Sequence, residues 1–226
     1  LYISFKDIMR VNEAAGNFIA YFQKVIEQKK KNPDAGIISR LIELTAQENI
    51  LDGEELTSTC ILLFIAGEET SVSLMSTGLY HLISRPDEWE VLRKNPEKIA
   101  TAIEELLRYD APVQIVGRIA GKDCEIGGKT IKQGDTLTIC LGSANRDPEV
   151  FDHADEFIMQ REPNKHLGFG GGAHYCLGDW LARIQTEMMI RSLLERYQTI
   201  EMKDVAPHWN NNLAIRCLTQ LPVSIR

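Results

Sequence analysis

The sequence predicts a mainly α-helical fold with a small antiparallel β portion, organised around one long central helix. Three observations support this prediction. Apolar residues follow helical spacing over residues 4–30, a second helical pattern continues over residues 52–84, and alternating or β-branched residues fill residues 113–141. The chain of 226 residues, 44% hydrophobic and 25% charged, has enough apolar content to bury a core.

Two helices are predicted before the long one. Residues 4–30 keep their helical pattern until the polar run KKKNPD, and residues 37–45 follow Asp34 as the expected cap. The long helix begins at a capping-box signature, Asp52 with Glu55. Its roughly 30 residues correspond to about 45 Å at 1.5 Å per residue. We therefore expect it to run through the whole molecule.

Prolines and a change of period predict the remaining elements. Arg85-Pro86 ends the long helix, and Asn95-Pro96 is expected to cap and begin a helix over residues 97–109. Gly127-Gly128 is an expected turn in the small sheet that follows. An irregular stretch, a helix over residues 177–197 and short strands are expected to complete a single region, residues 1–226.

The composition argues against two kinds of partner. A net charge of -7 argues against general nucleic-acid binding, which requires a surplus of Lys and Arg. The longest apolar run is Ile61 to Ala66, far short of the roughly 20 residues that cross a bilayer. We therefore expect neither a nucleic acid nor a membrane as partner.

The five cysteines are widely spaced, odd in number and contain no C-x-x-C pair. This pattern predicts neither a disulfide framework nor a four-cysteine zinc site, and it favours a reducing cytoplasm. Four of them, in apolar surroundings, are expected to be buried structural thiols: Cys60, Cys124, Cys140 and Cys217.

Cys176 differs because it lies in the glycine-rich segment HLGFGGGAHYCLGDWLAR, residues 166–183, at the start of a predicted helix. Glycines let a backbone approach a flat ligand closely. A helix amino terminus stabilises a thiolate over a thiol, and a thiolate is the form that binds a metal. The segment is therefore a candidate metal or cofactor site.

These residues resemble the haem-binding loop of the cytochrome P450 family, F-x-x-G-x-x-x-C-x-G, at Phe169, Gly172, Cys176 and Gly178. The resemblance implies the family fold, with haem b as cofactor and Cys176 as the ligand to its iron. It also implies that Phe169 packs near the sulfur, and that Gly170 and Gly178 let the loop approach the haem. A thiolate ligand suits O₂ activation.

A second match lies on the long helix, where Ala66, Gly67, Glu69 and Thr70 fit the family's oxygen-activation stretch. The resemblance implies that Gly67 lets the helix loosen where O₂ binds. It also implies that Thr70 and Glu69 relay the protons that the reaction consumes. In an isolated helix, the simpler interpretation of Thr70 is a hydroxyl that bonds back to the carbonyl four residues earlier.

A third match is Glu105 and Arg108, the family's E-x-x-R pair, whose spacing places both on one helix face. The resemblance implies that Arg161 joins this pair and that the three hold the cysteine loop. The pair alone is a weak signal, because surface pairs of this spacing are common. The segment ANRDPEVF, residues 144–151, is expected to be scaffold.

Arg118, His166 and His174 match family positions that contact the haem propionates, where charge-assisted hydrogen bonds fix the cofactor. Without the neighbouring motif, either histidine would be interpreted as an ordinary surface or core residue. A zinc site made of His166, His174 and Cys176 is a third possibility, with unusual spacing and no evident fourth ligand.

The resemblance to soluble bacterial or archaeal members implies a monooxygenase that inserts one atom of O₂ into a small hydrophobic organic substrate. Electrons are expected from a ferredoxin or flavodoxin that docks near Arg161, Lys165 and Arg183. The match covers the carboxy-terminal half of the family fold, and the amino-terminal half is expected to be absent. The alternative is therefore a truncated haem-binding protein without turnover.

Overall fold

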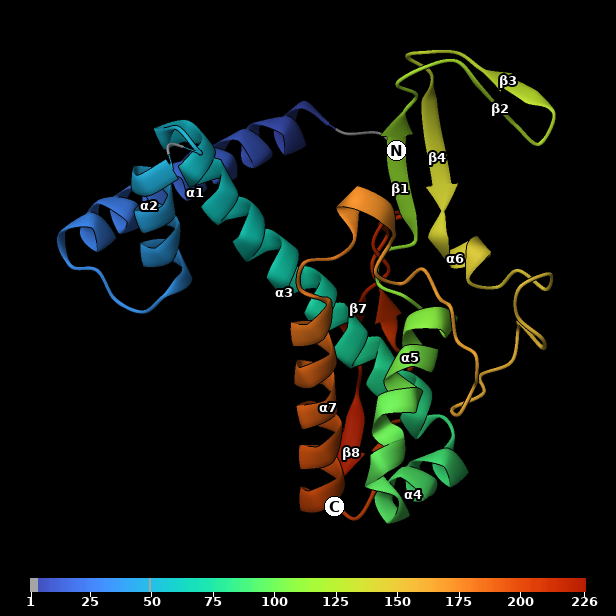
Figure 1. Ribbon diagram of the computed structural model, residues 1–226. Coiled ribbons are helices and arrows are strands. Elements are labelled where there is room, and N and C mark those ends of the chain that lie inside the picture. The colour runs from blue at the N-terminus through green and yellow to red at the C-terminus, as the bar shows by residue number, and fades with distance from the viewer. Residues whose placement is uncertain (1–3, 49) are drawn as a thin grey trace. The chain divides into compact units, whose positions relative to one another are not determined.

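The computed structural model describes residues 4–48 and 50–226. Within them the chain is mainly helical with small antiparallel ribbons, as predicted (Figure 1). The helices are α1 (Phe5–Lys31), α2 (Ile37–Glu48), α3 (Gly53–Ile83), α4 (Pro86–Lys94), α5 (Ile99–Tyr109), α6 (Leu141–Ala144) and α7 (Asp179–Arg196), with 3₁₀ turns η1 (Pro96–Lys98) and η2 (Gly172–His174). The strands are β1 (Ile115–Ile119), β2 (Cys124–Ile126), β3 (Lys129–Ile131), β4 (Thr136–Cys140), β5 (Ile200–Met202), β6 (His208–Trp209), β7 (Leu218–Gln220) and β8 (Val223–Ile225).

The chain divides into two compact units between Glu68 and Glu69. The first contains α1, α2 and the beginning of α3, and its buried core is small: Phe22, Ile26, Leu56 and Cys60. The predicted capping box is present at the start of α3, where Asp52 accepts the Glu55 N–H and Glu55 accepts the Asp52 N–H, both at 2.8 Å. Asp34 accepts the Gly36 N–H at 3.1 Å just before α2.

The long helix α3 is confirmed and spans 31 residues. Within the described residues it is also the one helix long and apolar enough to cross a membrane, with a mean hydropathy of 1.2 over 18 residues, 17% of them buried. The expectation that no segment is apolar enough was therefore wrong. That expectation counted only uninterrupted apolar runs. The helix α3 is apolar on average, although every 18-residue window of it contains Glu68 and Glu69. Length and composition alone do not separate a membrane span from the core helix of a globular protein.

The core of the second unit lies among the later part of α3 and the helices α4, α5 and α7, which lie side by side in Figure 1. Its fully buried apolar side chains include Leu82, Leu92, Ile99, Ile103, Leu106 and Ile190. The helix α4 was not predicted. Pro86 ends α3 and also stands at the first position of α4, where its missing N–H costs no hydrogen bond.

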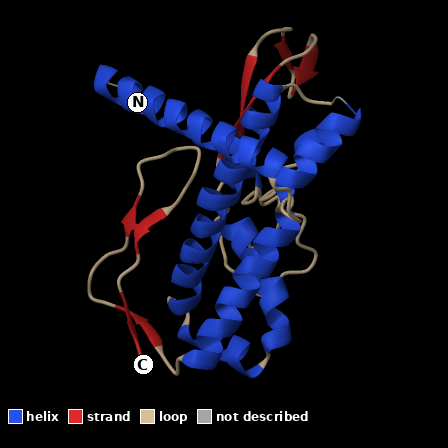
Figure 2. Ribbon diagram, turned by 90° about the vertical axis from the view of Figure 1, so that its left-hand side faces the viewer, coloured by secondary structure: helices blue, strands red, loops and turns tan. Residues whose placement is uncertain are grey.

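The strands form two-stranded antiparallel ribbons rather than one sheet. β1 pairs with β4, from Ile115 opposite Cys140 to Ile119 opposite Thr136, and β2 pairs with β3 across Gly127-Gly128. Both glycines have positive φ, 56° and 74°, as the predicted turn requires. The ribbons β5–β8 and β6–β7 lie to one side of the helices of this unit (Figure 2). On the first two ribbons Cys124 and Cys140 are exposed, so the prediction of buried thiols was wrong for them.

Candidate haem-thiolate site

The cysteine loop is a tight backbone structure between Phe169 and Gly178. Gly170 and Gly172 have positive φ, 72° and 68°, which side chains other than glycine rarely adopt. The Cys176 N–H donates to the carbonyl of Phe169 at 3.0 Å and closes the loop. Cys176 is a free, half-buried thiol just before α7, whose N-cap is Gly178. The loop therefore presents one thiol at the start of a helix, as predicted.

Two contacts hold the loop in place, one with Asn145 and one with α5. The buried Asn145 side chain accepts the N–H of Leu167 at 2.7 Å. Gly168 lies so close to α5 that an added Cβ would stand 2.8 Å from the carbonyl oxygen of Leu107. Neither residue was predicted to have a role, although Asn145 belongs to the segment that was expected to be scaffold. A side chain at residue 168 would force the loop away from α5.

The predicted group of Glu105, Arg108 and Arg161 is present. Arg108 donates to both carboxylate oxygens of Glu105 at 2.8 Å, and Arg161 donates to the same carboxylate at 3.1 and 3.3 Å. Glu105 and Arg108 are 0% and 1% exposed. This is a buried ionic cluster rather than a surface pair of the common kind.

The two arginines also bind the irregular segment that precedes the cysteine loop. Arg108 donates to the carbonyls of Asn145 at 2.9 Å and Ala154 at 2.7 Å. Arg161 donates to the carbonyl of Asp152 at 2.5 Å. The cluster therefore fixes this segment to α5, and the same segment supplies Asn145 to the cysteine loop.

The structure does not place His166 as an available propionate ligand. Its side chain is 4% exposed, and both ring nitrogens have partners: the Gly168 N–H donates to Nδ1 at 3.0 Å, and Nε2 lies 2.9 Å from Glu104. Nδ1 is therefore bonded to the loop backbone, and Nε2 faces the carboxylate of Glu104. His166 thus holds the loop instead.

Glu104 is a site residue that the sequence prediction missed. Its carboxylate accepts hydrogen bonds from Arg183 of α7 at 2.6 and 3.1 Å, and it also pairs with His166. Burial raises the pKa of Glu104, but the hydrogen bonds from His166 and Arg183 outweigh it and lower this pKa to about 2. Its position directly before the E-x-x-R pair was the available signal.

Arg183 connects Glu104 to the loop. It donates to Asp179 at 2.6 Å, and its guanidinium carbon lies 4.5 Å from the centre of the Phe169 ring. Asp179 also accepts the hydroxyl of Tyr175 at 3.0 Å. The hydrogen bond to Glu104 raises the pKa of Arg183 above its ordinary value.

The other two predicted propionate ligands, Arg118 on β1 and His174 in the loop, are exposed. Arg118 donates to the carbonyl of the adjacent Gly117 at 2.7 Å. Both side chains are accessible to a cofactor in the second unit, and their role stays a prediction.

The predicted oxygen-activation residues occupy consecutive turns of α3. Ala66 and Gly67 are exposed, whereas Glu69 and Thr70 are half-buried. α3 is helical through Gly67. A Cβ at Gly67 would meet nothing within 4 Å. The role of these four residues stays a prediction.

The loop suits a cofactor whose metal ion already has most of its ligands. Among residues 4–48 and 50–226, His, Cys, Asp and Glu side chains form no group of three suited to a metal ion, which argues against the zinc possibility. Added Cβ atoms at Gly171, Gly172 and Gly178 would meet nothing within 4 Å, so the loop has an open side. A single thiolate beside open space suits haem, whose ring supplies four nitrogen ligands.

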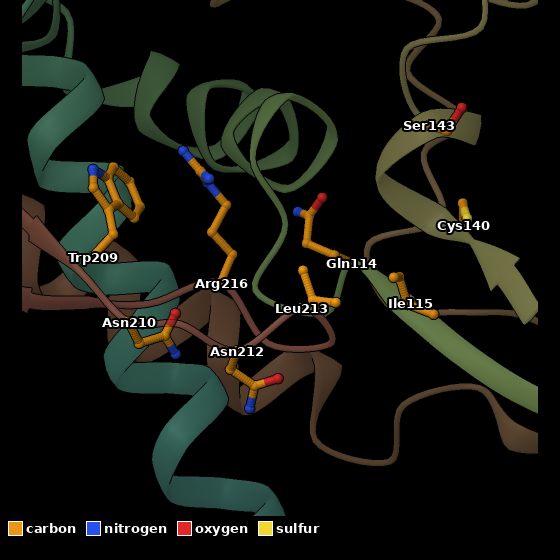
Figure 3. A pocket seen from close by; sticks show the side chains of 9 residues that line it. All are labelled: Gln114, Ile115, Cys140, Ser143, Trp209, Asn210, Asn212, Leu213 and Arg216. Carbon is orange, nitrogen blue, oxygen red and sulfur yellow. The ribbon is translucent and has the colours of Figure 1, made fainter. Parts of the chain in front are cut away.

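A separate open cavity of about 330 Å³ lies in the second unit (Figure 3). It is lined by Gln114, Ile115, Cys140, Ser143, Trp209, Asn210, Asn212, Leu213 and Arg216. Arg216 stacks on Trp209, 4.0 Å from its ring centre, and donates to Asp110 at 2.9 Å. Gln114 and Ile115, at the start of β1, therefore border a cavity.

Comparison with known proteins identifies the family. The family model described as cytochrome P450 matches residues 1–224. The chain is 40% identical over 219 residues to the biotin biosynthesis cytochrome P450 of Bacillus subtilis, covering 97% of this chain and 55% of that protein. It is 35% identical to 6-deoxyerythronolide B hydroxylase of Saccharopolyspora erythraea, covering 94% of this chain and 54% of the relative.

A solved structure, P450BioI in complex with an acyl carrier protein ligated to hexadec-9Z-enoic acid, matches with a TM-score of 0.92. The two are 41% identical, and the match covers 99% of this chain and 57% of that one. The chain thus spans about half the length of these relatives. It belongs to the cytochrome P450 family.

Proposed function

We propose that the protein to which this chain belongs is a haem-thiolate monooxygenase that inserts one atom of O₂ into a small hydrophobic organic substrate. The observation that carries the proposal is the open, glycine-rich loop that presents the single free thiol of Cys176 at the start of α7. Haem b is the proposed cofactor, and when bound it supplies the iron at which O₂ is activated.

The residues of the second unit have separate proposed tasks. Cys176 binds the iron as a thiolate, favoured by the amino terminus of α7. Phe169 packs beside the ligand, and Gly170 and Gly178 permit close approach of the loop. Arg118 and His174, both exposed, hold the propionates through charge-assisted hydrogen bonds.

Residues of α3 are proposed to manage protons and O₂. Glu69 and Thr70 would relay the protons that the reaction consumes. Gly67 and Ala66, which carry little or no side chain, leave room for O₂ beside the helix.

The electrons are proposed to come from a ferredoxin- or flavodoxin-type donor, but not through all of the cations first expected. Arg161 is 7% exposed and bound to Glu105, and Arg183 is neutralised by Glu104 and Asp179. Lys165 is exposed and remains a candidate contact.

The cytoplasm is the proposed location, which the cysteine pattern supports. The apolar character of α3 is proposed to serve the haem pocket rather than a membrane. Fractionation of cells that express the protein would test this, because an integral membrane protein would stay with the membranes after a carbonate wash.

The test of the function is the absorption spectrum of the haem-loaded, reduced protein under carbon monoxide, for wild type, Cys176→Ala and the control Cys124→Ala. Cys124 is exposed on β2, away from the loop in sequence. A strongly red-shifted Soret band in the wild type and control that is lost in Cys176→Ala supports thiolate ligation. An unshifted band in the wild type would contradict the proposal.

The alternative, haem binding without turnover, is distinguished by product formation. It predicts the red-shifted band together with reduction of the iron, but no oxidised product from any apolar substrate supplied with an electron donor. Measuring the chain beside one of its longer relatives separates a property of the chain from one of the family.

A further inference from the structure

Glu104 contacts the chain on both sides of the cysteine. His166 lies ten residues before Cys176 and Arg183 seven residues after it, and both bind the same carboxylate. Glu104 itself belongs to α5, whose helical backbone is packed in the core of the unit. The carboxylate thus ties the entry and exit segments of the loop to a fixed element.

The geometry of this tie is specific. The Arg183 Nε and terminal amino group donate to the two different oxygens of Glu104, at 2.6 and 3.1 Å, as a bidentate fork. The His166 Nε2 proton takes a further position on one of these oxygens at 2.9 Å. A shorter or uncharged side chain at residue 104 could not keep all three contacts at this strength.

Arg183 contacts residues of the cysteine loop, so a shift of its side chain would also shift the loop. Its guanidinium covers the Phe169 ring, and the Phe169 carbonyl accepts the Cys176 N–H at 3.0 Å. Through Asp179, Arg183 is also linked to the hydroxyl of Tyr175, the residue before the cysteine. The contacts of Arg183 therefore flank Cys176 on both sides.

The charges of this group do not cancel. Among the three ion-paired side chains, Arg183 carries one positive charge, and Glu104 and Asp179 together carry two negative charges. One negative charge remains close to the cysteine loop. Reduction of a bound haem iron adds an electron, so a nearby negative charge opposes it.

We propose that Glu104 is a positioning residue that holds Cys176 as the thiolate ligand by bridging His166 and Arg183, and that its charge lowers the reduction potential of the haem iron. This rests on the proposed function. It assigns to Glu104 a role separate from that of the adjacent Glu105, which binds Arg108 and Arg161.

The experiment compares three variants of the haem-loaded protein: Glu104→Gln, Glu104→Asp and the control Glu187→Gln. Glu187 is a matched control because it is also paired with an arginine, Arg191 at 2.7 Å, is similarly exposed, and lies about two turns along α7 from Asp179. The readouts are the fraction of reduced, carbon-monoxide-bound haem without the red shift, and the midpoint potential of the iron.

Glu104→Gln is expected to raise the unshifted fraction severalfold and to shift the midpoint potential upward. Glu104→Asp, which keeps the charge but shortens the reach, is expected to raise the unshifted fraction with a smaller shift in potential. It also provides the test if Glu104→Gln does not fold. Glu187→Gln is expected to match the wild type in both readouts.

Equal spectra and potentials for the two Gln variants, in a wild type that shows the red-shifted band, would overturn the role of Glu104 and leave the proposed function intact. A wild type without the red-shifted band would instead overturn the proposed function, and with it the role of Glu104. The two failures are therefore distinguishable.

Discussion

The side chain of Glu105 shows how a charged residue can be buried completely in this fold. Removing an ion from water costs several kcal/mol unless partners and hydrogen bonds compensate. Here the carboxylate accepts Arg108, Arg161, the Asn164 side chain and the Ile158 N–H. Other N–H groups of the two arginines donate to backbone carbonyls. The family motif predicted that Glu105, Arg108 and Arg161 interact. It did not predict the carbonyl partners, because they lie in an irregular segment without helical or strand periodicity.

Glu104, one residue earlier, gives a prediction on acid stability. Its pKa is lowered from 4.5 to about 2 by His166 and Arg183, against the effect of burial. Since the unfolded state binds the proton more tightly, this contribution to stability is complete above about pH 4.5 and is lost as the pH falls toward 2. Its upper limit is on the order of 3 kcal/mol, reduced by solvent because the side chain is 31% exposed.

The measurement is the free energy of unfolding by urea at several pH values for wild type and Glu104→Gln. The variant is expected to be less stable at pH 6, and the difference is expected to shrink as the pH falls below 4.5. Glu187→Gln serves as the control, with a difference near zero throughout. A difference between wild type and Glu104→Gln that is constant with pH would show that the carboxylate charge has no part in it.

At the scale of elements, the cysteine loop depends on how closely it can approach α5. Gly168 has an ordinary negative-φ or extended backbone, so the need for glycine there is one of space. A Cβ would meet the Leu107 carbonyl oxygen at 2.8 Å and the His166 ring at 3.1 Å. The first of these is backbone within a helix and cannot move without cost.

Gly168→Ala is therefore expected to destabilise the second unit by about 1–3 kcal/mol, the range for overpacking in a packed core. Gly171→Ala is the matched control, because residue 171 has extended φ and an added Cβ meets nothing within 4 Å. Thermal and urea unfolding of the haem-free protein measure both variants. Equal stability of the two would mean that the loop can move away from α5 at no cost.

The elements that sequence reasoning missed share a physical reason. Pro86 was interpreted only as the end of α3, although the same residue can begin a helix. Asn95 was expected to cap the next helix, but its side chain donates to Val91 at the end of α4, and the next three residues form a 3₁₀ turn. Sequence rules locate such helix boundaries. They do not determine whether Pro86 or Asn95 belongs to the helix before it or to the helix after it.

At the scale of the whole molecule, the contacts that the sequence did not reveal join distant residues. Glu104 and Arg183 are 79 positions apart, and nothing in the spacing of either residue indicates its partner. The helices α1 and α3 followed from periodicity, and the cysteine loop followed from a motif with fixed spacing. Periodicity and motifs do not describe how α5 packs against α7 and the cysteine loop, and this packing decides the partners of Glu104, Asn145 and Gly168.

This organisation leads to a prediction on cofactor binding. Cys176, Phe169, Arg118 and His174 all belong to the second unit, which also contains the three tryptophans, Trp89, Trp180 and Trp209. Haem that binds only the folded state stabilises it by RT ln(1 + [haem]/Kd), about 2.7 kcal/mol at a concentration one hundred times Kd. The urea midpoint followed by tryptophan fluorescence should therefore rise with haem concentration. Cys124→Ala should keep this dependence and Cys176→Ala should weaken it, because the ligand to the iron is lost. An equal rise in both variants would show that haem associates with the unit without the thiolate, and the ligand assignment would then be wrong.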